Sequence, residues 1–173
     1  MVGGRRIVDR VIAAIVVATG ENPVLITSSV EAPAWKTGLE IIPDVAAGPQ
    51  SSLRGILTAI MAGTGPVLIT GWDMPFIAAS LLTDLVARSA GFDAYLPEGE
   101  PLCGVYTPAC AEPIRLQLER GERKAVAFHS QVRAGLMPRS AVERFGEPGV
   151  LFFNVNSAVD LAEAEELWRN RRG

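Results

Sequence analysis

The sequence predicts a three-layer α/β domain in which a mostly parallel sheet carries helices on both faces. Short β-branched runs bounded by turn residues alternate with segments whose apolar residues recur at helical spacing. The chain has 173 residues, 49% of them apolar and 20% charged, which suits one domain (1–173) with a substantial core. We expect helices over residues 6–19, 51–62, 77–89, 108–120 and 158–169, and strands over residues 23–28, 39–42, 66–70, 93–96, 102–106 and 151–155.

Each expected element has a local reason. The first helix repeats apolar residues every three or four positions until Gly20, and the helix over 51–62 has serine at its start and Gly63 beyond its end. The runs PVLITS and PVLIT are short and β-branched, as buried strands are, and Pro43 ends the strand over 39–42. The helix over 108–120 ends at Gly121 and must hold Pro113 in its first turn.

One feature departs from the usual plan of such folds. The chain begins with a helix, and no predicted strand precedes it, although the first strand usually lies centrally in a doubly wound sheet. We therefore expect the first strand to be missing and two inner strands to have unpaired edges, which is unfavourable.

Composition limits the possible partners and location. The formal charge of -3 and the pI of about 5.2 provide no general attraction for a polyanion, so nucleic acid is not an expected partner. Apolar runs are too short to span a membrane, which makes the cytoplasm the expected location. Cys103 and Cys110 are expected to be reduced and buried.

Asp73 gives the sharpest chemical signal, in the run VLITGWDMPF. A buried strand delivers this carboxylate to its carboxyl end, where open α/β sheets bind ligands. A lone carboxylate there suits Mg²⁺, which commonly uses one or two carboxylates together with substrate phosphates and water. Asp73 could equally cap the helix that follows. Trp72 and Trp35 are expected to pack, and Trp72 could shield a metal from water.

The run FFNVNS gives a second signal. If residues 151–155 form a strand, alternation puts Asn154 and Asn156 on the same side. Two neighbouring amides could contact a metal-bound phosphate or the edge of a substrate. The alternative is a helix N-cap at Asn156 or Ser157, and for Ser157 the cap is the better interpretation.

Together these motifs resemble the MobA-like nucleotidyltransferases, the molybdenum cofactor guanylyltransferases, which carry D-M-P-F-like and late N-x-N-x-x-x-D-L motifs. Before the first of these motifs, Asp44, Gly48 and the following LRGI resemble D-x-x-x-x-G-P-L-x-G-I, and between the two motifs Arg123 matches a G-x-R element. The matching motifs follow one another in the family's order along nearly the whole chain. It implies a nucleotide-diphospho-sugar-transferase-like, Rossmann-like fold.

The resemblance also implies a reaction and a site. A molybdopterin phosphate oxygen would attack the α-phosphorus of GTP, transferring GMP and releasing pyrophosphate. Asp73 would be the catalytic residue and would bind Mg²⁺, with Asn154 and Asn156 at the same centre on the pterin side. Asp44 and Gly48 would border the nucleotide pocket, and Arg123 would contribute to a basic lip for the pterin phosphate or to a solvated helix end. GTP, molybdopterin and molybdoenzyme-maturation proteins are the implied partners.

Two departures from the family pattern concern the nucleotide. Arg54 stands where the family commonly has a small residue. The family opens with L-A-G-G-x-S-x-R-M-G-x-D-K, whose backbone N–H groups and lysine would hold phosphates. Here the residues from Gly3 to Val11 resemble the later G-x-P-L-I-D-R-V segment instead. We therefore expect the chain of 173 residues to bind GTP poorly.

Several alternatives remain open at this stage. The natural start could lie upstream of Met1, or the gene could have decayed or been repurposed. The enzyme could use CTP or another small phosphorylated acceptor. A non-catalytic accessory protein that binds the pterin is the remaining alternative.

Overall fold

The structure is a computed structural model that describes residues 1–45, 51–122 and 124–171. Its α-helices are α1 (Ile7–Thr19), α2 (Ser52–Ala62), α3 (Ala79–Arg88), α4 (Ala111–Glu119), α5 (Arg139–Val142), α6 (Pro148–Leu151) and α7 (Ala158–Asn170). Its strands are β1 (Leu25–Ile26), β2 (Ile41–Ile42), β3 (Val67–Thr70), β4 (Ala94–Pro97), β5 (Cys103–Tyr106) and β6 (Ala134–Met137). No described helix has the length and apolar character needed to span a bilayer.

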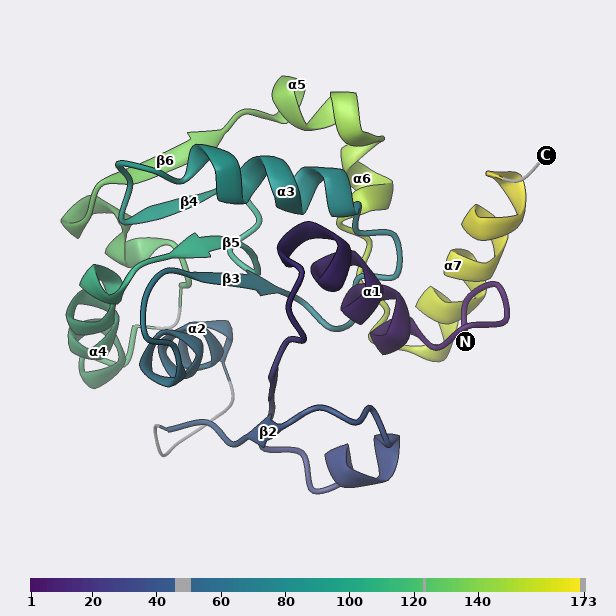
Figure 1. The fold of residues 1–173 in the computed structure, drawn as a ribbon, viewed down its shortest axis with the longest axis horizontal. Coiled ribbons are helices and arrows are strands. Elements are labelled where there is room, and N and C mark those ends of the chain that lie inside the picture. The colour runs from purple at the N-terminus through teal and green to yellow at the C-terminus, as the bar shows by residue number, and fades with distance from the viewer. Residues whose placement is uncertain (46–50, 123, 172–173) are drawn as a thin grey trace.

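The main sheet has four strands in the order β3-β5-β4-β6 (Figure 1). β5 is antiparallel to both β3 and β4, while β4 and β6 are parallel. Three of the four strands therefore run in one direction, and the sheet is mostly parallel, as predicted. β5 is reversed because a short turn joins it to β4.

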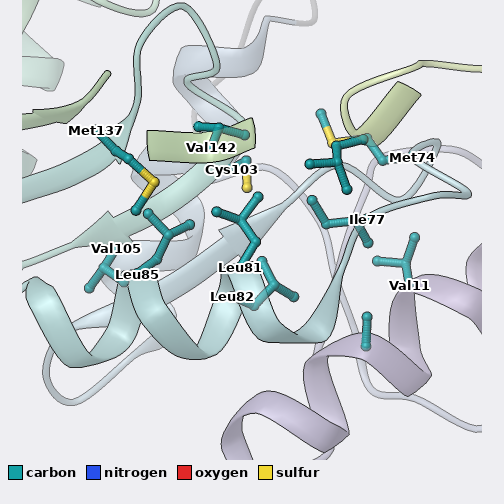
Figure 2. Close-up of a cluster of buried hydrophobic side chains, with 12 residues drawn as sticks. Val11, Met74, Ile77, Leu81, Leu82, Leu85, Cys103, Val105, Met137 and Val142 are labelled. Atoms are coloured by element: carbon teal, nitrogen blue, oxygen red, sulfur yellow. The ribbon is translucent and has the colours of Figure 1, made fainter. Parts of the chain in front are cut away.

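Helices cover both faces of this sheet, which confirms the three-layer arrangement. On one face, α1 and α3 pack on β5 through a core that includes Val11, Leu81, Leu82 and Val105 (Figure 2). On the other face, α2 and α4 pack on β4 and β5. That second core contains Leu53, Ile56, Leu57, Ile60, Ala94, Leu96, Tyr106, Cys110, Ile114 and Phe128.

The alternation of side chains along β5 explains how one strand serves both cores. Cys103 and Val105 belong to the first core, while Tyr106 belongs to the second. Both cysteines are free and buried, as expected. The Tyr106 hydroxyl donates a hydrogen bond of 2.6 Å to the carbonyl of Pro101, which satisfies its polar end.

The short strands β1 and β2 form a separate parallel pair. Among the described residues, β1 pairs with β2 alone and β3 pairs with β5 alone, so one edge of each strand is unpaired. A groove of about 1250 Å³ is lined by both strands together with α1 and α2.

In the second half of the chain one prediction was wrong and one strand was missed. Residues 151–155 do not form a strand, because Pro148 starts the short helix α6, which reaches Leu151. The strand β6 was not predicted. Its sequence AGLM is short, and Gly135 is needed because a Cβ there would lie 2.7 Å from the rings of Phe92 and Tyr95.

Candidate active site

β3 leads directly into the loop that carries Asp73. The Gly71 N–H donates a 2.8 Å hydrogen bond to the carbonyl of Leu102, which fixes the start of the loop. A Cβ on Gly71 would lie 2.7 Å from Asp73 Oδ1, so the absence of a side chain there lets the carboxylate fold back over the backbone. Met74 and Phe76 are buried and anchor the far side. The loop is therefore held rigidly at both ends.

The Asp73 carboxyl is only partly exposed, and burial raises its pKa above the ordinary value. The hydrogen bonds and ion pairs of the described residues give this carboxylate no basic side-chain partner. A cation would relieve the cost of holding its charge there. The alternative that Asp73 caps the next helix is not supported, since Ala78 is the N-cap of α3 and has no side-chain cap.

Asn154 and Asn156 lie in an exposed loop between α6 and α7, not on a strand. The Val155 N–H, between them, donates a 3.0 Å hydrogen bond to the carbonyl of Asp73. The structure therefore brings the Asp73 loop and the two-asparagine segment together through their backbones. Both asparagine side chains remain exposed.

The residues after Asn156 form a helix cap. Ser157 is the N-cap of α7, and its hydroxyl accepts a 3.2 Å hydrogen bond from the Asp160 N–H. Asp160 Oδ2 in turn accepts from the Asn156 N–H at 2.9 Å, and this bond is the main reason that the pKa of Asp160 is lowered. The prediction that Ser157 caps the helix is confirmed. Asp160 thus fixes the backbone beneath Asn156.

The groove contains a second group of polar residues where β1, β2 and β3 end. Ser28 donates a 3.1 Å hydrogen bond to Asp44 Oδ2 and accepts one of 3.1 Å from the Asp44 N–H. Buried Oγ atoms of Ser51 and Thr70, both in the groove lining, have no hydrogen-bond partner among the described residues. Buried hydroxyls without partners favour a polar ligand.

The predicted site residues therefore fall into separate groups. Asp44 lies in the groove, Gly71 and Trp72 of the Asp73 loop also line it, and Asn156 lines a neighbouring cavity. Gly48 and Arg123 lie outside the described residues. Sequence motifs did not single out Ser28, although its position at the end of the PVLITS run was a usable signal. Within the described ranges, no group of three or more His, Cys, Asp or Glu residues could hold a metal by itself.

The comparisons with known proteins agree on one family. The model of the MobA-like NTP transferase domain matches residues 1–134. A Pelotomaculum thermopropionicum protein named "Probable molybdenum cofactor guanylyltransferase" is 31% identical over 154 residues, covering 86% of this chain and 75% of that protein. A molybdenum cofactor guanylyltransferase of Cereibacter sphaeroides is 31% identical over 142 residues, covering 76% of this chain and 67% of that protein.

Solved structures have the same fold. The molybdopterin-guanine dinucleotide biosynthesis protein A of Archaeoglobus fulgidus superposes with a TM-score of 0.80 at 25% identity, covering 98% of this chain and 89% of that one. A 2-C-methyl-D-erythritol 4-phosphate cytidylyltransferase of Thermus thermophilus gives 0.64 at 17% identity, covering 98% and 92%. At that identity, the second likeness concerns the fold alone.

Proposed function

Because the chain belongs to the MobA-like NTP transferase domain family, whose members are nucleotidyltransferases, we propose that it transfers GMP from GTP to molybdopterin. An oxygen of the molybdopterin phosphate attacks the α-phosphorus of GTP, the new P–O bond forms, and pyrophosphate leaves with the bonding electrons. The observation that carries this proposal is the meeting of the Asp73 loop with the asparagine segment beside the groove that contains Asp44.

Asp73 is the proposed ligand for Mg²⁺. The fit rests on this partly buried carboxylate, whose pKa is raised by burial and to which the described part of the chain gives no basic side-chain partner. A single carboxylate suits an ion that fills its other positions with water and substrate oxygens. When bound, Mg²⁺ would neutralise the phosphate charge that develops during transfer.

The chain's own residues supply positioning. The 3.0 Å hydrogen bond from Val155 to Asp73 holds the two loops together, and in this proposal Asn154 and Asn156 contact the acceptor. The amide of an asparagine both donates and accepts hydrogen bonds, and it can therefore orient a phosphate or a ring edge without adding charge. Holding two substrates in an attack geometry is a large part of the rate enhancement in such reactions.

Asp44 is the proposed contact for the guanine base. A carboxylate accepts hydrogen bonds, and the pairing edge of guanine offers two adjacent donors, the ring N–H and the exocyclic amino group. The pairing edge of cytosine offers one donor, at one end, followed by two acceptors, and a carboxylate repels an acceptor. The two hydrogen bonds with Ser28 hold Asp44 at the end of β2, where the groove could receive the base.

Calorimetry tests the nucleotide assignment. We expect Mg-GTP to bind this chain more tightly than Mg-CTP, and Asp44→Asn to reduce that preference because the amide replaces one acceptor with a donor. Equal affinity for both nucleotides would favour the sister activity with CTP or another base. Binding of molybdopterin without either nucleotide would favour the accessory protein.

An assay of pyrophosphate release with molybdopterin, GTP and Mg²⁺ tests the reaction itself. Asp73→Asn should abolish release while the circular dichroism spectrum stays that of the parent. Asp84→Asn is the matched control, because Asp84 pairs with Arg88 and Arg144 on the surface of α3 and such exposed pairs contribute little. Full activity of Asp73→Asn would remove that residue from the mechanism.

A further inference from the structure

The first turn of α1 carries an ion pair that the proposed reaction does not use. Asp9 lies three residues after Arg6, the residue that precedes the helix. Arg6 Nε donates to Asp9 Oδ2 at 2.6 Å, and Arg6 Nη2 donates to Asp9 Oδ1 at 2.7 Å. Two side-by-side bonds of this kind fix the plane of a guanidinium. The Asp9 carboxylate therefore decides where the remaining N–H groups of Arg6 point.

The free edge of that guanidinium holds a distant segment. Arg6 Nη1 donates a hydrogen bond to the backbone carbonyl of Trp35, the last residue of the 3₁₀ helix η1 (Ala32–Trp35). Only the planar fork of an arginine can hold a carboxylate on one edge and a carbonyl on the other in this way. One side chain thus ties α1 to η1.

The turn formed by η1 depends on support from outside, because its own hydrogen bonds are local. The N–H groups of Ala34 and Lys36 donate to carbonyls three residues back, at 2.9 and 3.4 Å. These bonds shape the turn without attaching it to the rest of the protein. Lys36, which follows η1, has a φ of 47° and is the one non-glycine residue with positive φ in the described part of the chain. Such a conformation costs free energy and persists where neighbouring groups hold it.

The supported turn places Trp35 against the loop of the proposed metal ligand. The ring centroids of Trp35 and Trp72 lie 5.1 Å apart, with a tilt of 44° between the planes. Trp72 is 45% exposed, so the Trp35 ring restrains a side chain that otherwise faces solvent. Trp72 immediately precedes Asp73, and a rotation of its backbone would move the Asp73 carboxylate. The ring contact therefore braces the loop between its two ends.

We propose that Arg6 and Asp9 are positioning residues for Asp73, an inference that rests on the proposed transferase function. Asp9 orients the guanidinium, the guanidinium holds Trp35, and the Trp35 ring restrains Trp72. The ion pair acts on the metal ligand through this chain of contacts and touches no substrate. Its side chains are 44% and 27% exposed, and exposed pairs contribute little to stability. Loss of the pair should therefore affect transfer more than folding.

Steady-state kinetics of pyrophosphate release with Mg²⁺, GTP and molybdopterin test the proposal on the full chain. A misplacement of about 1 Å can cost about 100-fold in rate, and the loop keeps its other anchors, so Asp9→Asn and Arg6→Lys should each lower kcat about tenfold. The KM for GTP and the urea midpoint should stay near those of the parent. Asp9→Glu should keep more activity than Asp9→Asn, because it retains the carboxylate although asparagine has the closer shape. That order separates an ionic tie from a role in packing.

Glu112→Gln is the matched control. Glu112 and Arg115 form an exposed pair of the same spacing, three residues apart and 2.6 Å long, on α4. Among the described residues, the Arg115 guanidinium ties no second segment to this helix. Neither residue lines the groove that contains Asp44 or the cavity beside Trp72. We expect the kcat of Glu112→Gln to equal that of the parent.

Two spectroscopic measurements follow the same chain of contacts without turnover. Indole rings as close as those of Trp35 and Trp72 couple and give a paired circular dichroism band, which Trp72→Leu identifies by removing it. This band should weaken in Asp9→Asn and persist in Glu112→Gln. Electron paramagnetic resonance of Mn²⁺ with GTP reports the metal site, and its spectrum should change in Asp9→Asn and stay that of the parent in Glu112→Gln.

The outcomes separate this inference from the proposed function. If the parent releases pyrophosphate, parent-like kcat in Asp9→Asn and Arg6→Lys overturns the positioning role and leaves the transferase standing. If the parent releases none, the transferase proposal falls. A Mn²⁺ spectrum that requires Asp73 and changes in Asp9→Asn then still supports the positioning role, and a spectrum that Asp9→Asn leaves unchanged overturns it. An unchanged tryptophan band in Asp9→Asn overturns it in either case.

Discussion

Replacing Gly71 by alanine should displace the proposed metal ligand without removing it. The new Cβ would lie 2.7 Å from Asp73 Oδ1 and 3.2 Å from Met74 Cε. Ordinary van der Waals contact begins near 3.4 Å, so the carboxylate oxygen must move by about 0.7 Å to restore such a contact. The methionine end can also give way, whereas Gly71 itself is held by its hydrogen bond to Leu102.

A shift of this size predicts a large loss in the rate of transfer and a small loss in stability. A misplacement of about 1 Å can cost about 100-fold in rate, so transfer by Gly71→Ala should fall by about that factor. Unfolding free energy should fall by only about 1–3 kcal/mol, the usual cost of adding a methyl group to a packed site.

Electron paramagnetic resonance with Mn²⁺ in the presence of GTP measures the metal site directly, and urea denaturation measures stability. Gly149→Ala is the control, because a Cβ there meets only Glu147 Oε1 at 3.9 Å, an ordinary contact, and Gly149 lies in α6, outside the groove. Parent-like Mn²⁺ binding and transfer by Gly71→Ala would refute the assignment of Asp73, because a displaced ligand could not leave both unchanged.

Three further predictions concern charge and packing. Burial raises the pKa of Asp73, so ionisation of this carboxyl destabilises the fold as pH rises from the ordinary value of 3.8 through the raised one. Asp73→Asn should therefore be more stable than the parent at neutral pH, and urea midpoints at acid pH should show the difference vanish. Hydrogen bonds from Arg133 lower the pKa of Asp93, so the stability that Asp93 contributes is complete above its ordinary pKa and is lost as pH falls through the lowered one. Asp93→Asn should accordingly flatten the acid side of the stability profile, and an unchanged profile would contradict this. Leu82→Ala, at a fully buried position, should cost about 2–5 kcal/mol in urea denaturation, and a loss below about 1 kcal/mol would mean that the core collapses around it.

The fold could be predicted where periodicity and turn chemistry agree. The helix around Val11 and the strand before Gly71 have clear apolar patterns and clear ends, and the structure has both. The run at 151–155 misled because two phenylalanines and a valine suggest β structure locally. Pro148 instead begins a helix, and the N–H of Val155 goes to a loop carbonyl rather than to a neighbouring strand.

The site could be predicted only in part. A motif in the sequence could single out Asp73 and Asn156, but their proximity depends on a hydrogen bond between loops that are over 80 residues apart. The pairing of Trp35 with Trp72 likewise joins distant segments, and the expectation that they pack is confirmed. The fixing of Asp44 by Ser28 depends on two short strands lying side by side, which no local pattern specifies.

The separation of β1 and β2 from the main sheet has a consequence for local unfolding. A two-stranded pair has little stability of its own, and among the described residues few backbone hydrogen bonds join these strands, including those from the N–H groups of Leu25 and Thr27. These amides should exchange with deuterium long before those of β5, at an opening free energy well below that of global unfolding. Since Asp44 follows β2, a nucleotide bound in the groove would slow the exchange of these amides selectively. Occupancy of the groove could therefore be followed at individual amides without any catalytic turnover.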